Sequence, residues 1–254
     1  MYGYVEWTDE VRRVTASERE ILRQRFYCVK IPGKKGTPAF LLRRRSAAAA
    51  GKLQKAGVIR AVFPVEFPWM SEFAAMEIRP AEPWGLYRAL AAELVQTRLA
   101  VCCQTGKQIP VAVYARRITE DVRRTVTDLC VRNRYVILSS PERDDMFCRR
   151  LRREFGVPLV QTEDPVQLSK AAVLLRFSGE VASQPGQEVI DLFPGGLPVS
   201  EVLMLAPELE TRIPAGCDRL QMLAALYGGG ILRPGQIQVM PSFAAKGAFD
   251  GEKA

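Results

Sequence analysis

The sequence predicts an α/β protein with a Rossmann-like, mostly parallel sheet that lacks a glycine-rich phosphate loop and is preceded by a small α+β domain. Two observations predict this class. Short apolar runs alternate with amphipathic stretches of helical length, and the runs are apolar throughout, as in strands buried on both faces of a parallel sheet. The runs lie at 99–103, 111–115, 135–139, 157–160, 172–177 and 189–193. A chain of 254 residues that is 48% hydrophobic can also bury a sizeable core.

Residues 1–80 form the predicted α+β domain. Thr15 and Glu18 have the spacing of a capping box, which predicts the start of a helix. Ser46 is the expected N-cap of a second helix, and Pro and Gly residues separate the strand-like runs. The expected elements are helices over 15–24 and 47–56 and strands over 26–31, 39–42 and 58–65.

Residues 81–243 form the predicted Rossmann-like domain, and residues 244–254 form a flexible tail. Strands that alternate with amphipathic helices typically form right-handed crossover units in one sheet. Asp218 is the expected N-cap of a later helix that ends at three consecutive glycines. The expected helices span 84–98, 120–133, 142–155 and 219–227, and a last strand spans 236–240.

The loops after three of the predicted strands are unfavourable for a phosphate. Each offers a Ser or Thr as helix cap and places two or more carboxylates in the first turn, which satisfies the helix dipole and repels an anion. None carries the GxGxxG spacing that lets a pyrophosphate approach the backbone. We therefore expect no cofactor, and the likeness to Rossmann modules concerns the fold alone, which does not imply a function.

The chain contains no histidine. Ser-His-Asp triads, Cys-His dyads and imidazole-based zinc sites are therefore excluded. The six cysteines have no CxxC spacing, so we expect no metal site and interpret most of them as small buried hydrophobic residues. Our first hypothesis is accordingly a non-catalytic binding or interaction module that acts through contacts with another protein.

The main alternative is a nucleotide- or metabolite-binding enzyme or sensor with its ligand between the two domains. Ligands of open α/β sheets bind beyond the carboxyl ends of the strands. The candidate ligand-binding residues at such ends are Cys103, Arg116, Ser140, Gly195 and Gly196. The two glycines also fit a Pro-Gly turn between elements, which is the commoner use of such a sequence.

A second alternative is nucleic-acid binding by the basic N-terminal half. The net charge is +8, and residues 1–110 carry 18 basic and 10 acidic side chains. The candidate phosphate-binding residues are Lys34, Lys35, Arg43, Arg44 and Arg45. No recognition-helix turn, zinc finger or aromatic RNA-binding motif accompanies them, which favours a protein partner instead.

We expect a cytoplasmic protein without a membrane partner. No apolar run approaches the roughly 18 residues that a spanning helix needs. The first residues also lack the basic and apolar regions of a signal peptide.

Overall fold

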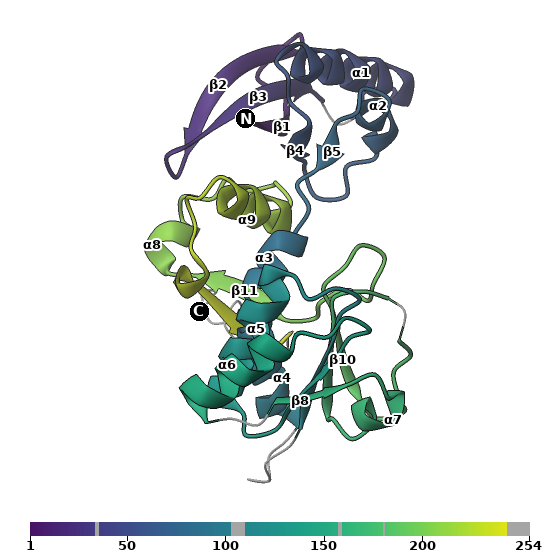
Figure 1. Cartoon of the computed structure of the whole chain (residues 1–254). Coiled ribbons are helices and arrows are strands. Elements are labelled where there is room, and N and C mark those ends of the chain that lie inside the picture. The colour runs from purple at the N-terminus through teal and green to yellow at the C-terminus, as the bar shows by residue number, and fades with distance from the viewer. Residues whose placement is uncertain (34–35, 103–109, 157–158, 180, 243–254) are drawn as a thin grey trace. The chain divides into compact units, whose positions relative to one another are not determined.

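The computed structural model describes residues 1–33, 36–102, 110–156, 159–179 and 181–242 (Figure 1). The chain divides into two compact units. The first comprises Met1–Leu86 and Leu205–Ile237, and the second comprises Tyr87–Met204 and the residues from Gln238 onward. The change at Leu86 lies close to the boundary that we predicted after residue 80.

The first unit contains a five-stranded sheet with the order β2-β3-β1-β4-β5. Its strands are β1 (Tyr2–Thr8), β2 (Thr15–Ile21), β3 (Gln24–Pro32), β4 (Arg60–Val62) and β5 (Arg79–Pro80). The central strand β1 is parallel to β3 and β4, whereas β2 is antiparallel to β3. The helices of this unit include α1 (Ala39–Lys55), α2 (Met70–Ala74), α8 (Pro207–Glu210) and α9 (Arg219–Gly228).

The core of the first unit is built on three phenylalanine rings. Phe73 meets Phe63 and Phe67 edge to face, with ring centroids 4.9 and 5.6 Å apart, a geometry that adds to the gain from burial. Leu53 of α1 and Val29 of β3 are fully buried in the same cluster. The inner side of α1 therefore packs on the sheet.

Three predictions for this unit are wrong. Residues 15–24 form β2, the turn after it and the first residue of β3, not a helix, because pairing with β3 overrides the local capping-box signal. Residues 39–42 begin α1 and are not a strand, and Phe40 is 69% exposed there. Ser46 lies buried inside α1, which already begins after Pro38, so it caps no helix.

The segment Leu205–Ile237 belongs to the first unit, although we predicted it in the Rossmann-like domain. Two hydrogen bonds fix it there: Asp218 N donates to Phe63 O at 2.8 Å, and Phe63 N donates to Gln221 Oε1 at 2.9 Å. The apolar pattern of α9 shows that the helix is buried. It carries no information about which of two sheets the helix packs against.

The glycines at the end of α9 allow a close approach to the sheet of the first unit. A Cβ at Gly228 would overlap the Tyr2 hydroxyl of β1, and a Cβ at Gly229 would overlap the side-chain amide of Gln24 in β3. At the other end, Asp218 caps α9 as predicted, because its Oδ1 accepts the Gln221 N–H at 3.0 Å.

The second unit contains a parallel sheet with the order β10-β9-β6-β7-β8. Its strands are β6 (Val111–Tyr114), β7 (Val136–Ser139), β8 (Leu159–Thr162), β9 (Val173–Arg176) and β10 (Glu188–Asp191). The strands β6, β7 and β8 are neighbours in chain order. The chain then crosses over the sheet, so that β9 pairs with the other side of β6. This is the strand order of a Rossmann fold with its switch point between β6 and β9. The predicted fold class is therefore confirmed.

Three helices lie side by side over one face of this sheet, namely α4 (Ala91–Cys102), α5 (Glu120–Arg132) and α6 (Asp145–Phe155) (Figure 1). The predicted apolar stripe of α5 is buried as expected at Val122, Val126, Leu129 and Cys130. A right-handed crossover places the short helix α7 (Pro165–Leu168) on the opposite face. There Leu168 and Ala171 pack against Ala112, Ile137 and Leu174.

One of the predicted parallel strands does not exist. The run 99–103 continues α4 as far as Cys102, and residue 103 lies outside the described residues. A short apolar run does not distinguish the end of a helix from a buried strand, which explains the error. The helix expected over 84–98 is two helices, α3 (Trp84–Ala89) and α4.

The end of the described chain contains β11 (Val202–Leu205), the 3-10 helix η1 (Pro234–Gln236) and β12 (Ile237–Met240). β11 and β12 pair in a two-stranded sheet, so the strand predicted over 236–240 is confirmed. The predicted tail 244–254 lies outside the described residues. Among the described helices, none combines the length and apolar character needed to cross a bilayer.

The aromatic cluster predicts a large difference between two identical substitutions in the first unit. Phe73→Ala removes a fully buried ring and should lower the free energy of unfolding by about 3–5 kcal/mol. Phe40→Ala removes a largely exposed ring and should change it by less than about 0.5 kcal/mol. Urea denaturation of both variants measures this. Equal losses would show that residues 39–42 are buried after all.

Candidate functional site

The strands β6 and β9 are neighbours in the sheet, but the chain continues from β6 to β7 on one side and from β9 to β10 on the other. The carboxyl ends of β6 and β9 therefore form the switch point, which is where Rossmann folds bind their ligands. Arg116 follows β6, and Ser140 follows β7. Gly195 and Gly196 follow β10, so four of the predicted ligand-binding residues do lie at this edge of the sheet. Cys103, the fifth, lies outside the described residues.

Two backbone N–H groups of the loop between β6 and α5 already have partners within the protein. The Arg116 N–H donates to Ser178 Oγ at 3.1 Å, and the Ile118 N–H donates to Glu142 Oε2 at 2.7 Å. Thr119 caps α5, and its Oγ1 accepts the Val122 N–H at 3.5 Å. A carboxylate thus lies against the start of α5, where a dinucleotide-binding loop would present its N–H groups to a phosphate.

Ser140 helps to hold Glu142 in place. Its Oγ accepts the Glu142 N–H at 3.1 Å, and the Glu142 carbonyl accepts a hydrogen bond from Gln161 Nε2 at 3.0 Å. Ser140 is only 1% exposed, so its hydroxyl lies beneath the surface of the loop. Ser140 therefore holds the backbone of Glu142, whose carboxylate accepts the Ile118 N–H in the loop between β6 and α5.

Gly195 and Gly196 wrap around a buried ion pair. Arg176 at the end of β9 binds Asp191 at the end of β10 through two bonds, Nε to Oδ1 at 2.6 Å and Nη2 to Oδ2 at 2.7 Å. The Leu197 N–H donates to the same carboxylate at 2.7 Å. Gly195 has φ +84°, and a Cβ at Gly196 would overlap Asp191, so both positions need glycine for this turn.

The basic residues proposed for nucleic acid do not gather into one patch among the described residues. Arg43, Arg44 and Arg45 lie on α1, where consecutive side chains point about 100° apart. Arg43 Nε binds Glu72 Oε1 at 2.7 Å, and Arg45 Nη1 donates to the Pro32 carbonyl at 2.7 Å. Arg44 is exposed, and Lys34 and Lys35 lie outside the described residues.

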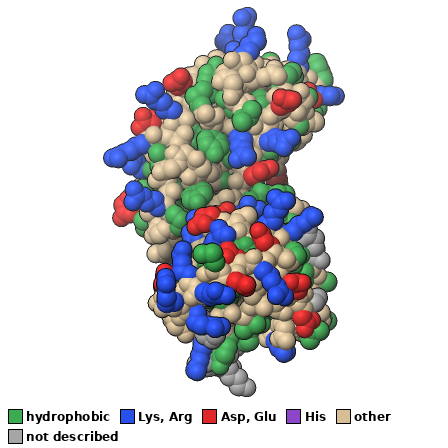
Figure 2. All heavy atoms as spheres, viewed as in Figure 1, with side chains coloured by type: hydrophobic (Ala, Val, Ile, Leu, Met, Phe, Trp, Pro, Cys, Tyr) green, Lys and Arg blue, Asp and Glu red, His purple; other side chains and the backbone are tan. Residues whose placement is uncertain are grey.

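A groove with a volume of about 740 Å3 lies between the outer surfaces of α5 and α6. Figure 2 shows basic side chains, interspersed with acidic ones, over these helices. The α5–α6 groove is lined by Glu120, Arg123, Arg124, Thr127, Asp128, Asp144, Met146, Phe147, Arg149, Arg150 and Arg153. The sequence contained a signal for this groove, since the arginines of the predicted helix 142–155 lie off its apolar stripe.

Ion pairs occupy one part of the α5–α6 groove. Asp144 caps α6 by accepting the Phe147 N–H at 3.0 Å, and it also binds Arg123 Nη2 at 2.8 Å. The Phe147 N–H and the Arg123 guanidinium together lower the pKa of Asp144 below its usual range. Arg149 and Arg153, in contrast, form no ion pair with any residue that the structure describes.

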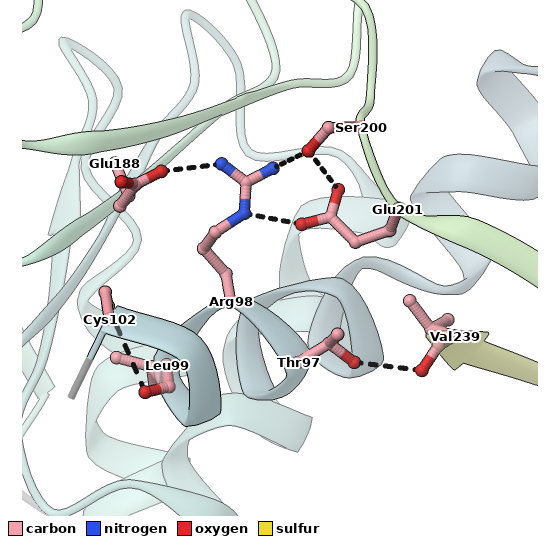
Figure 3. Close-up of polar contacts among 8 residues, drawn as sticks. All are labelled: Thr97, Arg98, Leu99, Cys102, Glu188, Ser200, Glu201 and Val239. Carbon is pink, nitrogen blue, oxygen red and sulfur yellow. Dashed lines mark hydrogen bonds and ion pairs between the residues drawn. The ribbon is translucent and has the colours of Figure 1, made fainter. Parts of the chain in front are cut away.

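At the opposite edge of the same sheet, Arg98 of α4 forms a closed polar network (Figure 3). Its guanidinium donates to Glu188 Oε2 at 2.7 Å, to Glu201 Oε1 at 2.5 Å and to Ser200 Oγ at 2.8 Å. The hydrogen bond to Glu201 raises the pKa of Arg98, with a further contribution from Glu188. All three donor groups of the guanidinium are used within the protein, so this network joins α4 to β10 and to the start of β11.

The described cysteines offer no activated nucleophile inside the two cores. Burial raises the pKa of Cys28 and Cys217 to about 11 and that of Cys130 to about 12, so these thiols stay protonated at neutral pH. Within the described ranges, no three Cys, Asp or Glu side chains gather closely enough to hold a metal ion.

Comparison with known proteins identifies no family. No protein-family model and no curated protein matches the chain. Among solved structures, L-tryptophan dehydrogenase from Nostoc punctiforme is 13% identical with a TM-score of 0.29, and the match covers 70% of this chain but only 56% of that one. Aspartate transcarbamoylase from Trypanosoma cruzi is 13% identical with a TM-score of 0.33, over 91% and 81% of the two chains. Likenesses this weak assign no activity to the chain.

The buried ion pair predicts that two carboxylates of the second unit differ strongly in importance. Asp191→Ala keeps the Cβ next to Gly196 but leaves Arg176 buried without its partner, and should cost about 3–5 kcal/mol of unfolding free energy. Glu163→Ala breaks the exposed pair with Arg143 and should cost less than about 1 kcal/mol. Denaturant unfolding compares them. A small loss for Asp191→Ala would contradict a structural role for the ion pair.

The lowered pKa of Asp144 predicts acid-dependent stability. Its carboxylate contributes stability above the ordinary Asp pKa near 4, and this contribution is lost as the pH falls through the lower folded-state pKa. Asp144→Asn still caps α6 but loses this contribution, so the stability difference from wild type should shrink between pH 6 and pH 2. Asp145→Asn, one residue along, is the control. A pH-independent difference for Asp144→Asn would contradict the assignment.

Proposed function

We propose that this chain is a non-catalytic interaction module in which the Rossmann-like sheet serves as a scaffold for contacts with another protein. The observation that carries the proposal is the loop between β6 and α5, where Ser178 and Glu142 accept the Arg116 and Ile118 N–H groups. A phosphate at this position would have to displace a negatively charged side chain that is already hydrogen bonded.

Other features support the same proposal. The chain has no histidine, which is the commonest general base, and burial raises the pKa values of Cys28, Cys130 and Cys217, so these thiols are not activated nucleophiles. The glycines that could approach a ligand are instead required by the Asp191 carboxylate. Both lines of support are independent of the loop between β6 and α5.

A titration with nucleotides tests the proposal. Wild-type protein should show no change in Tm with NAD, NADP or ATP at millimolar concentration. A ligand present at 100 times its Kd would add about 2.7 kcal/mol of stability. A shift of several degrees with any of these nucleotides would overturn the proposal and restore the nucleotide-binding alternative.

Two variants of Glu142 test whether its carboxylate takes the place of a phosphate. Glu142→Ala removes the acceptor of the Ile118 N–H and should cost about 1–2 kcal/mol, of which inorganic phosphate recovers a part. Glu142→Gln keeps an acceptor oxygen and should lose less stability without any response to phosphate. Thermal unfolding with and without 10 mM phosphate separates the variants, and equal behaviour of both would contradict this role.

A further inference from the structure

We propose that the α5–α6 groove binds an acidic amphipathic helix of a protein partner. This inference rests on the proposed function, because it names the surface and the partner through which the interaction module acts. It concerns the outer face of the two helices and uses none of the residues at the switch point of the sheet.

The size of the groove fits a short helix. Its lining residues on α6 extend from Met146 to Arg153, which is two turns or about 10 Å at a rise of 1.5 Å per residue. Thr127 and Phe147 line the same groove, and Phe147 is buried. Met146, which also lines the groove, is exposed, so the groove offers an apolar side chain among charged groups, a setting that suits an amphipathic helix.

The unpaired arginines define the charge of the partner. Arg149 and Arg153 stand four residues apart on α6, so they lie one above the other on one face of the helix. Arg123, Arg124 and Arg150 are already paired with Asp144, Asp121 and Glu154, respectively. Two carboxylates one helical turn apart on a partner would match the two arginines that remain.

An apolar anchor lies close to these arginines. Met146 is 83% exposed although it is an apolar residue, and it stands one turn before Arg149 and Arg150 on α6. Methionine adapts its shape to apolar partners and is common at binding surfaces. A leucine or similar residue on the partner helix would bury it.

The acidic residues of the groove favour a polypeptide over a nucleic acid. Glu120, Asp128 and Asp144 line the same groove as the arginines. A nucleic acid strand carries one negative charge about every 3.4 Å and would meet these carboxylates wherever it followed the groove. A helix can place a lysine opposite the carboxylates and its own carboxylates opposite Arg149 and Arg153.

Fluorescence anisotropy with a labelled 15-residue designed helix tests the proposal at 150 mM salt. The probe carries two glutamates four residues apart, flanked by a leucine and a lysine. A second probe has the same composition with the glutamates two residues apart, and a single-stranded oligonucleotide of equal length is the third. Wild-type protein should bind the first probe at least tenfold more tightly than the other two.

Adjacent arginines provide the matched variants. Arg153→Glu reverses a charge in the groove and should weaken binding of the first probe at least tenfold, whereas Arg152→Glu, which lies outside the groove, should weaken it less than threefold. Both substitutions lie in the last turn of α6, so they affect the helix dipole alike, and thermal unfolding checks this. If Arg153→Glu prevents folding, the double variant Arg149→Ala and Arg153→Ala replaces it, and this variant should also weaken binding of the first probe.

Three results would overturn the proposal: no binding of the first probe, equal effects of Arg153→Glu and Arg152→Glu, or tighter binding of the oligonucleotide. Self-association of the chain that Arg153→Glu abolishes would likewise overturn it, because the occupant would then be a second copy. Each of these results leaves the nucleotide titration unchanged, so failure of the groove and failure of the proposed function are distinguishable.

Discussion

The hydrogen bond from the Ile118 N–H to the Glu142 carboxylate is the contact on which our account of this Rossmann-like sheet depends. It lies at the switch point, where the connections after β6 and β9 lead to opposite sides of the sheet and where ligands usually bind. Glu142 is supported by Ser140, and the neighbouring Arg116 N–H is taken by Ser178 from the other side of the switch point. A side-chain carboxylate therefore lies where a phosphate lies in dinucleotide-binding proteins with a Rossmann fold.

The same principle operates one strand away, at the end of β10. The Arg176 guanidinium and the Asp191 carboxylate are almost completely buried, and their cost of desolvation is offset by the direct bonds between them and by the Leu197 N–H. At the carboxyl ends of the strands, the Glu142 and Asp191 carboxylates are thus hydrogen bonded within the protein. The outer surface of α5 and α6 differs, because Arg149, Arg153 and Met146 face solvent there without a partner among the described residues.

Part of this could be predicted from the sequence, and the limits are physical. Four of the predicted parallel strands, at 111–115, 135–139, 172–177 and 189–193, and the buried stripe of α5 follow from apolar patterning, which reports local burial. The run 99–103 and the segment 15–24 were predicted wrongly, because short local patterns fit both a helix and a strand until tertiary contacts decide. The carboxylates at the helix starts were visible in the sequence, but the bond between Glu142 and Ile118 joins two different loops. The need for glycine at Gly196 depends on Asp191 in the folded chain and was equally hidden.

Amide hydrogen exchange at Ile118, followed by NMR, tests most directly whether the Glu142 carboxylate accepts the Ile118 N–H when no ligand is present. We predict that the Ile118 N–H of the protein alone exchanges slowly, that Glu142→Ala makes the exchange fast, and that millimolar NAD leaves the wild-type rate unchanged. Fast exchange in the protein alone that becomes slow when NAD is added would show that the loop is open and awaits a nucleotide, and would contradict the role of Glu142 as the internal anion.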